Sequence, residues 1–509
     1  GLALLLPLLL DGLHVVGGGI VVPEPHPRGH RRAGDEQHQG CHQGDQELAG
    51  QMAQAPGPFS FLAAAGGEEV DVRVVMPLYS AVSQQYRDMM QTEAEFDISI
   101  AWRRQYCGVK SLRRDGVTYY FIDNEYYFKR DMLYGCFDDG ERFAFFSKAA
   151  LEMLDKIGYH PDIVHAHDWQ AALSVIYLKC KYNNRPGYTG IDTVFTIHNI
   201  EYQGKYDLAI LADLFELDWW RDTVEWDGCI NLMKGAIVCA DKVTTVSPRY
   251  SEEIRGEEHS PGLSAILNEN AYKLSGILNG IDYVYYNPSK DTSIAKTFSW
   301  RSLGGKYENK AALQREIGLP ETNDVPLISI VSRLASHKGL DIISEMMYSL
   351  MYESNCQIVV LGKGEAAYEK FFCDLQANFP DRVRALITYD RDLAKRIYAA
   401  SDIFMMPSKS EPCGLSQMIA SRYGAIPVTR ETGGLYDSIK GYWNDNGTIK
   451  GNGFTFANYS PWELKERTQA AIGVWNDVEI RNKLIGKIMR TDFSWKSSAI
   501  KYIEMYNSL

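Results

Sequence analysis

The chain has 509 residues, more than one hydrophobic core supports, so two domains of about 200 residues each are expected. Its formal net charge of -12 argues against a polyanionic partner such as a nucleic acid. No apolar stretch approaches the ~20 residues that a membrane-spanning helix needs, so no membrane partner is expected. The nine cysteines form no Cys-x-x-Cys pair, which favours a reducing compartment, and the cytoplasm is the simplest one.

Residues 1–69 differ in composition from the rest of the chain. They contain no Lys, Tyr or Asn, although the chain has 31 Tyr. No basic residue precedes the apolar run from Leu2 to Leu10, which argues against a signal peptide, and the stretch is too poor in Ser and too acidic for a plastid transit peptide. We favour a third explanation, that this segment is not native coding sequence, and we expect it to be poorly ordered.

From Val70 onward, apolar runs of strand length alternate with helical patterns such as Glu141–Lys156, and this alternation is typical of α/β domains. In the first half of the chain, the expected strands are Val70–Met76, Val117–Ile122, Ile163–Ala166, Thr193–Thr196, Lys242–Val246 and Leu274–Leu278.

A polar stretch with little periodicity, Asn287–Lys310, marks the crossing into a second domain. The next expected strands are Leu327–Ser332, Gln357–Leu361 and Ala385–Thr388, and Trp495–Leu509 has a helical pattern. We therefore expect domains over residues 70–290 and 291–490, followed by a terminal segment over residues 491–509.

Two loops carry the most informative residues. Ser408–Leu415 follows the apolar run Asp402–Pro407, and Glu431–Leu435 follows Ala425–Val428, so each loop leaves the carboxyl end of a strand, where open α/β sheets bind ligands. A Glu beside helix-opening amides can take sugar hydroxyls, and Thr-Gly-Gly amides can cradle a diphosphate. Either motif alone could be an ordinary turn, but together they predict a nucleotide-sugar site.

Further polar residues follow other expected strands. Arg333 and Lys338 lie on the loop after Leu327–Ser332, where two cations could stabilise an anionic leaving group, although such pairs are usually solvated. The cluster His165-Ala166-His167-Asp168 could suggest a metal site, but no third ligand has helical spacing, so no metal is expected.

With these motifs the chain resembles the bacterial-type glycogen and starch synthases, which are retaining glucosyltransferases that use ADP-glucose. The resemblance runs from about Val70 to the C-terminus. The further motifs that carry it are Pro161–Trp169, Phe195–Gly204, Thr244–Pro248, Leu278–Asp282 and Val331–Gly339.

The resemblance implies an α/β fold of the GT-B type, with two facing Rossmann-like domains, an active site in the cleft between them, and a last helix that crosses back to the first domain. It also implies an apolar first strand followed by a Lys-Thr-Gly-Gly loop. No such loop precedes Val70. We therefore expect the first strand of the N-terminal domain to be missing and the activity of this chain to be impaired.

The same resemblance implies the site residues. Arg333 and Lys338 would neutralise the leaving diphosphate, Glu411 would bind glucose through its 3-OH, and His198 and Asp168 would face the scissile bond. The expected substrate-binding residues are Asn279, Cys413, Gly414, Leu415, Thr432, Gly433, Gly434, Tyr202 and Gln203. No metal or other cofactor is implied.

The expected function is therefore transfer of glucose from ADP-glucose to the non-reducing 4-OH of an α-1,4-glucan such as glycogen or starch, with retention. Two alternatives remain open. One is a glucan-binding homologue without catalysis, which the missing Lys-Thr-Gly-Gly loop favours. The other is a related glycosyltransferase that uses UDP-glucose.

Overall fold

The computed structural model describes residues 2–5 and 70–509, which divide into two compact units. The first unit holds the described residues up to Thr244, with Ile254–Ser275 and Ala499–Leu509, and the second holds Thr245–Glu253 and Gly276–Ser498. The second unit therefore begins before residue 290, where polar composition alone placed the boundary. Within the described residues, no helix is long and apolar enough to cross a membrane.

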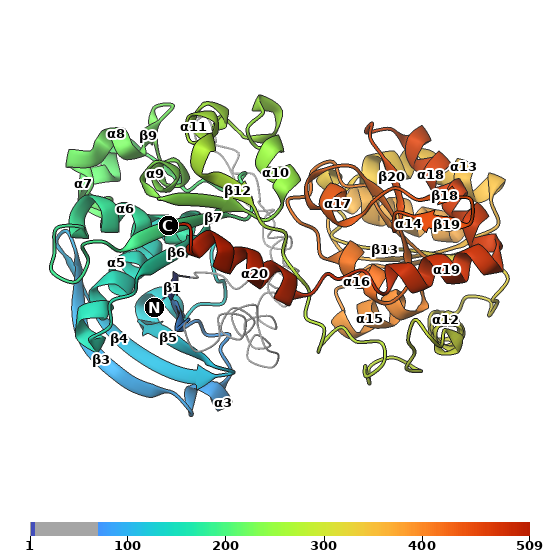
Figure 1. Ribbon diagram of the computed structural model, residues 1–509, viewed down its shortest axis with the longest axis horizontal. Coiled ribbons are helices and arrows are strands. Elements are labelled where there is room, and N and C mark those ends of the chain that lie inside the picture. Colours follow the sequence, from blue (N-terminus) through green and yellow to red (C-terminus); the bar gives the residue numbers. More distant parts are fainter. Residues whose placement is uncertain (1, 6–69) are drawn as a thin grey trace, which may run out of the picture. The chain divides into compact units, whose positions relative to one another are not determined.

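The first unit is built on a nine-stranded sheet with the order β12-β11-β7-β6-β1-β2-β5-β4-β3. Its strands are β1 (Leu2–Leu5), β2 (Val72–Pro77), β3 (Gln91–Ile100), β4 (Arg103–Arg114), β5 (Val117–Asp123), β6 (Ile163–His167), β7 (Asp192–Ile197), β11 (Lys242–Thr245) and β12 (Leu274–Gly276). Strands β8 (Lys205–Tyr206), β9 (Glu225–Trp226) and β10 (Cys229–Asn231) form a small separate sheet. Strands β7, β6, β1, β2 and β5 form a parallel run in this sheet, and β4 pairs antiparallel with both β5 and β3 (Figure 1).

The expectation that the first strand is missing is wrong. Strand β1 lies in the middle of the sheet, parallel to β2 on one side and to β6 on the other, with Leu4 opposite Val74 and His165. A central parallel strand needs a short apolar run, and the beginning of the chain supplies one. The expectation of poor order over residues 6–69 lies outside the described residues.

The central position of β1 can be tested with a proline. Because β1 has a strand on each side, we expect Leu4→Pro to remove a ladder hydrogen bond, leave its buried acceptor unpaired and destabilise the first unit by about 1–3 kcal/mol. Thermal melting of Leu4→Pro and of a matched Leu4→Val variant measures this. Equal melting temperatures for the two variants would mean that β1 contributes nothing to the sheet.

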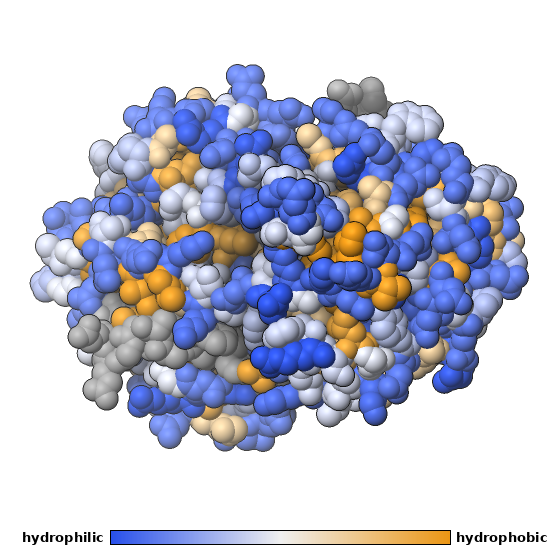
Figure 2. All heavy atoms as spheres, turned by 45° about the vertical axis from the view of Figure 1, so that its right-hand side comes forward, coloured by the Kyte–Doolittle hydropathy of each residue, from blue (hydrophilic) through white to orange (hydrophobic). Residues whose placement is uncertain are grey.

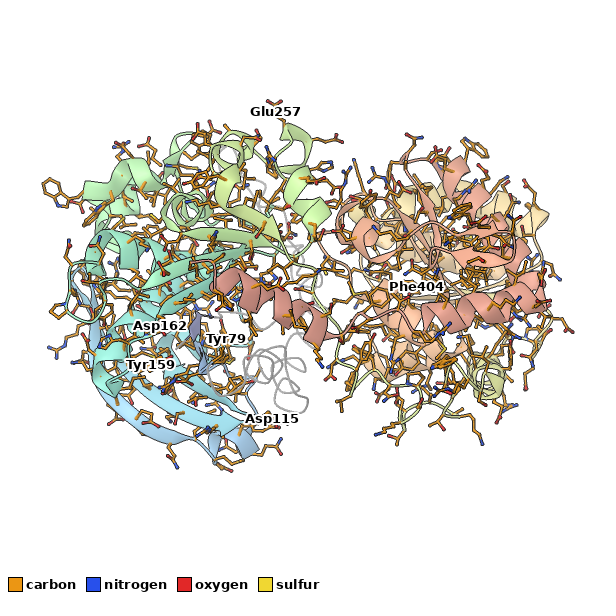
Figure 3. All side chains as sticks on the ribbon, viewed as in Figure 1. Tyr79, Asp115, Tyr159, Asp162, Glu257 and Phe404 are labelled. Atoms are coloured by element: carbon orange, nitrogen blue, oxygen red, sulfur yellow. The ribbon has the colours of Figure 1, made fainter. Side chains whose placement is uncertain are left out.

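Helices cover the faces of this sheet (Figure 1). The longest, α5 (Asp139–Ile157), buries Phe143, Phe145 and Phe146, and Gly158, which follows it, caps its C-terminus in the left-handed conformation. Asp162 lies between α5 and β6, and its carbonyl accepts the amide of Asp192 at 2.9 Å, which aligns the starts of β6 and β7 (Figure 3). The other α-helices are α3 (Gln84–Arg87), α4 (Glu125–Phe128), α6 (Asp168–Tyr177), α7 (Leu211–Phe215), α8 (Arg221–Val224), α9 (Leu232–Cys239), α11 (Ser264–Glu269) and the C-terminal half of α20 (Trp495–Tyr506).

The second unit contains a six-stranded parallel sheet with the order β15-β14-β13-β16-β17-β20. Its strands are β13 (Leu327–Val331), β14 (Gln357–Leu361), β15 (Val383–Leu386), β16 (Ile403–Met406), β17 (Ile426–Arg430) and β20 (Phe454–Phe456), and an antiparallel pair, β18 (Trp443–Asp445) and β19 (Thr448–Lys450), lies apart. Phe404 on β16 is 1% exposed and lies at the centre of this sheet (Figure 3). From β13 the chain adds β14 and β15 toward one edge of the sheet, and it then returns to β16 and adds β17 and β20 toward the other edge. The order in which strands are added therefore reverses between β13 and β16.

Helices α12 to α19 surround this second sheet. Their bounds are α12 (Gly304–Ile317), α13 (Leu340–Glu353), α14 (Ala366–Asn378), α15 (Arg391–Ala400), α16 (Ser416–Arg422), α17 (Gly433–Ser438), α18 (Pro461–Asn476) and α19 (Val478–Ile488), and the short α10 (Pro248–Glu253) packs on α17. Hydrophilic side chains dominate the face drawn in Figure 2, and apolar ones gather there in separate patches rather than in a continuous band.

Candidate active site

The strand order of the second unit places the loops with the predicted donor-site residues after neighbouring strands. The order is that of a doubly wound sheet whose switch point lies between β13 and β16, and such folds bind ligands outside the carboxyl ends of the strands at that point. The loop after β13 carries Arg333 and Lys338, and the loop after β16 is Ser408–Leu415. The loop after β17, the next strand along, carries Thr432 and Gly433.

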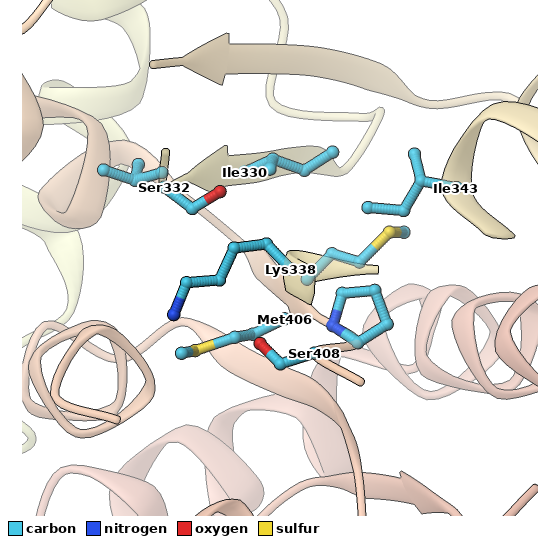
Figure 4. Close-up of a pocket in the computed structure, with 9 residues that line it drawn as sticks. Ile330, Ser332, Lys338, Ile343, Met406 and Ser408 are labelled. Carbon is cyan, nitrogen blue, oxygen red and sulfur yellow. The ribbon is translucent and has the colours of Figure 1, made fainter. Parts of the chain in front are cut away.

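A buried ion pair joins the first two loops. Lys338 Nζ lies 2.8 Å from Glu411 Oε2, and both side chains are almost fully buried. The Ser408 hydroxyl donates to the same carboxylate oxygen at 2.9 Å. Lys338 extends along a small cavity that Ser332, Met406 and Ser408 also line (Figure 4). A cation and an anion, 73 residues apart, are thus held at the switch point.

Arg333 lies on the same loop as Lys338 but is only half-buried. Its Nη2 is 3.3 Å from Nε2 of His337, and the carbonyl of His337 accepts the amide of Lys409 at 2.9 Å. The loop after β13 is therefore tied to the loop after β16 by backbone as well as by the Lys338 ion pair.

The two glycine-containing loops are in backbone contact. The amide of Gly434 donates to the carbonyl oxygen of Glu411 at 3.0 Å. A Cβ atom at Gly433 would lie 2.0 Å from that same oxygen, and one at Gly434 would lie 2.0 Å from the carbonyl oxygen of Cys413. Only glycine permits this approach, so the Thr-Gly-Gly residues and the Glu411 loop form one structural unit.

A carboxylate that sequence reasoning missed lies against these amides. The amide of Gly433 donates to both carboxylate oxygens of Glu253 at 3.0 and 3.1 Å, and the Thr432 hydroxyl donates to Oε2 at 3.2 Å. Arg249 Nε contacts the same carboxylate at 3.2 Å. The Gly433 amide, which the sequence predicted to bind phosphate, can therefore bind an anion, because it binds the Glu253 carboxylate in this structure.

The other predicted residues of the second unit lie on the same loops. The amide of Asn279 donates to the sulfur of Cys413, and burial raises the pKa of this thiol to about 12, so it stays protonated at neutral pH. Gly414 has a φ of 71°, and Leu415 is half-buried just before α16 begins. Cys413 therefore has no thiolate available as a nucleophile.

In the first unit, Asp168 opens α6 directly after β6, which lies at that sheet's own switch point, beside β1. Its φ of 58° is unusual for a residue other than glycine, and such strain concentrates at functional sites. Its carboxylate accepts the amide of His198 at 2.8 Å. Burial raises the pKa of Asp168 to about 7, although the amides of His198 and Asn199 oppose this shift.

His198 follows β7, the neighbour of β6, so the two residues leave adjacent strands. Its Nε2 is 2.9 Å from Nδ1 of His167, and burial lowers the pKa of His198 to about 3, so the ring is neutral at physiological pH. Asp168 and His198 thus form one cluster, joined by the bond from the His198 amide to the Asp168 carboxylate.

Tyr202 and Gln203 lie on the loop beyond His198. Tyr202 is half-buried. Gln203 is buried, its amide nitrogen donates to the carbonyls of Ile200 and Pro261, and its oxygen accepts from Asn231. These bonds use both N–H groups of the Gln203 amide, so this side chain shapes the loop rather than presenting a donor to a ligand.

Comparison with known proteins agrees with this architecture. Residues 60–269 match the family model of the starch synthase catalytic domain, and residues 313–485 match that of glycosyl transferases group 1. The catalytic domain of starch synthase IV from Arabidopsis thaliana, solved with ADP and acarbose, is similar with a TM-score of 0.78 and 35% identity over 86% of this chain and 92% of that one. A sucrose-phosphate synthase from Thermosynechococcus elongatus, at 16% identity and a TM-score of 0.52, shares the fold. The protein is a glycosyltransferase of the GT-B class.

Its relatives define the family more closely. The glycogen synthase of Geobacillus thermodenitrificans is 44% identical over 86% of this chain and 91% of its own length. That of Bacillus cereus is 44% identical over 86% of this chain and 92% of its own. The chain belongs to the glycogen and starch synthase family, which confirms the resemblance found in the sequence.

Proposed function

We propose that this protein transfers glucose from ADP-glucose to the non-reducing 4-OH of an α-1,4-glucan, with retention of the α configuration. The observation that carries the proposal is the convergence of the Lys338, Glu411 and Thr432–Gly434 loops at the switch point of one doubly wound sheet. The ADP bound to the similar starch synthase IV supports the choice of nucleotide.

In this proposal, Arg333 and Lys338 stabilise the diphosphate as the bond to C1 breaks, and the amide of Gly433 adds a neutral donor. Glu411 binds a glucose hydroxyl while it holds the Lys338 ammonium in place. Asn279, Cys413, Gly414, Leu415 and Thr432 complete the wall of the donor site. The leaving phosphate takes the acceptor proton on the same face of the sugar, which accounts for retention.

The first unit contributes charge and shape in the same proposal. His198 and Asp168 are proposed to act on the positive charge that develops at C1 in the transition state, which the Asp168 carboxylate stabilises. Tyr202 contacts the sugar, and Gln203 holds the loop that presents it.

The experiment is to incubate the full chain with glycogen and either ADP-glucose or UDP-glucose, and to measure nucleoside diphosphate release and glucan extension. We expect ADP release that depends on acceptor and new α-1,4 linkages. Faster turnover of UDP-glucose than of ADP-glucose would show that UDP-glucose is the donor instead. Binding of glycogen without nucleotide release from either donor would favour the non-catalytic alternative.

Glu253 provides a separate prediction for the donor site. Because its carboxylate occupies the amide of Gly433, it competes with a diphosphate for that donor and repels its charge. We expect Glu253→Gln to tighten ADP binding about 5- to 10-fold, which corresponds to ~1 kcal/mol, measured by titration calorimetry.

The matched control is Glu252→Gln. Glu252 contacts the same Arg249 but is 68% exposed, whereas the Gly433 amide donates to Glu253. We expect it to leave ADP affinity unchanged. Weaker ADP binding by Glu253→Gln than by Glu252→Gln would show that Glu253 supports the loop rather than competing with the nucleotide.

We also propose that the protein acts in the cytoplasm. The eight cysteines in the described part of the chain are free thiols, as a reducing compartment favours. Fractionation of cells that express the tagged chain tests this, and recovery in the secreted fraction would contradict it.

A further inference from the structure

A histidine outside the predicted site controls the geometry of His198. His167 is the last residue of β6, and its side chain is 8% exposed. Its Nδ1 lies 2.9 Å from Nε2 of His198, and the two rings are 5.2 Å apart with a tilt of 31°. The contact joins the ends of two adjacent parallel strands, so it fixes one edge of the His198 ring.

Both rings are neutral, because burial holds the pKa of each well below its usual range. In a hydrogen bond between two neutral imidazoles, one nitrogen carries the hydrogen and the other accepts it. The distance alone does not say which ring donates, but the opposite nitrogen of His167 decides it.

Nε2 of His167 is buried and has no hydrogen-bond partner among the described residues. If it carried the hydrogen, a buried N–H group would be left without an acceptor, and orphaned N–H groups are rarer in native proteins than under-used acceptors. The hydrogen therefore belongs on Nδ1 of His167, which donates to Nε2 of His198. His198 then carries its own hydrogen on Nδ1.

The ring of His167 also packs against a second histidine ring, that of His165. It stacks on His165 with ring centres 4.2 Å apart and an angle of 23°. His165 has both nitrogens engaged, Nδ1 with the Tyr506 hydroxyl at 2.8 Å and Nε2 with the Thr196 hydroxyl at 2.6 Å. Residues from β6, β7 and α20 thus fix the plane of the stack, which leaves His167 little freedom to rotate.

We propose that His167 is a positioning residue, which donates from Nδ1 to Nε2 of His198 and so fixes the orientation of His198 and its Nδ1–H tautomer. The inference rests on the proposed function in one respect, namely that His198 acts on the donor sugar. In the Nδ1–H tautomer, the nitrogen of His198 that remains for a ligand is a donor, suited to a sugar hydroxyl or to the oxygen of the leaving group.

The test compares the wild type with three full-length variants. His167→Phe keeps an aromatic ring to stack on His165 but cannot donate, and His167→Asn offers an amide N–H near the position of Nδ1. His160→Asn is the matched control, because His160 lies on the same unit but is partly exposed and contacts Asp155 at 3.4 Å.

The first readout is the tautomer of His198, from ¹⁵N NMR of histidine-labelled protein at neutral pH. We expect the Nδ1–H form in the wild type, in His167→Asn and in the control, and a mixture of tautomers or the Nε2–H form in His167→Phe. An unchanged His198 tautomer in His167→Phe overturns the proposal, as does an Nε2–H tautomer in the wild type. This readout stands even if the wild type proves inactive, so it is separable from the proposed function.

The second readout is kinetic. We expect His167→Phe to lower kcat about 10- to 100-fold with little change in KM for the donor, since a misplaced group near the reacting bond loses rate rather than affinity. His167→Asn should recover most of kcat. Equal losses in His167→Phe and His167→Asn would show that His167 serves packing only, and would overturn the positioning role.

Discussion

Lys338→Met is expected to lower turnover by about 10²–10³, because it removes a cation that stabilises the departing diphosphate. The structure places the Lys338 ammonium at the switch point between β13 and β16, where it contacts Glu411 at 2.8 Å. Methionine keeps the length and volume of the side chain without its charge, so the cavity along β13 stays filled. Initial rates with ADP-glucose and glycogen measure the effect.

The same substitution should also destabilise the second unit. Lysines on such loops are usually solvated, but both partners of this ion pair are almost fully buried. Removing one partner of such a pair leaves a buried charge and costs about 3–5 kcal/mol. The double variant Lys338→Met with Glu411→Gln should recover most of the melting temperature and none of the activity.

A second buried pair in the same unit is the matched control. Lys310 Nζ lies 2.7 Å from Asp402 Oδ2, and both side chains are 1% exposed. Asp402 directly precedes β16, so this pair lies at the amino ends of the strands, whereas Glu411 follows their carboxyl ends. Lys310→Met should lose comparable stability and keep its rate per folded molecule. Equal turnover of Lys338→Met and Lys310→Met would show that Lys338 has no role in the reaction.

Much of the architecture could be predicted from the sequence, because strands of a buried parallel sheet consist of nearly continuous apolar runs. Nine strands were placed within two residues at their starts, and the loops after β13, β16 and β17 were predicted to bind ligands. Their convergence follows from the strand order, which the family resemblance implied and which local patterns do not contain.

The long hairpin of β3 and β4 was missed for a local reason. It turns at Ala101 and Trp102, and Ala101 has a φ of 47°. Two-residue hairpin turns usually carry Asn or Gly at such positions, so the sequence lacked the usual turn signal. The expected absence of the first strand was wrong because composition says that a segment is unusual, not that an apolar run within it cannot pair.

The contacts that give the site its chemistry join residues far apart in the chain. Lys338 and Glu411 are 73 residues apart, and Gly433 and Glu253 are 180 apart. Sequence spacing carries no signal for such pairs. His167 was visible in the His-x-His-Asp cluster, but only the register of β6 against β7 shows that its ring faces His198.

Asp168→Asn is expected to lower turnover about 10²-fold and to change its pH dependence. The wild-type pKa of about 7 means that the carboxylate forms only as pH rises through neutrality. If this charge stabilises the transition state, the wild-type rate should rise between pH 6 and 8 and then level off. The Asn variant cannot ionise, so its residual rate should not show that rise. Rates at saturating donor between pH 5.5 and 8.5 measure both effects.

The same substitution should stabilise the first unit at high pH. The pKa of Asp168 is raised in the folded state from 3.8 to about 7, so the folded protein holds this proton more tightly than the unfolded chain. The wild type therefore loses stability progressively as pH rises from about 4 to 7, and the loss stays constant above 7. Asn avoids this loss, its oxygen can still accept the amide of His198, and it tolerates the left-handed φ of 58°.

We therefore expect the melting temperature of Asp168→Asn to equal that of the wild type near pH 4, to exceed it by a growing margin up to about pH 7, and to keep that margin at pH 8. Asp155→Asn, an exposed position on α5, is the control and should show no such trend. An Asp168→Asn variant that is less stable than the wild type at pH 8 would mean that the carboxylate's bonds to the His198 and Asn199 amides outweigh its desolvation. The residue would then serve the fold as well as the reaction, and its raised pKa could not be the cause of a pH-dependent rate.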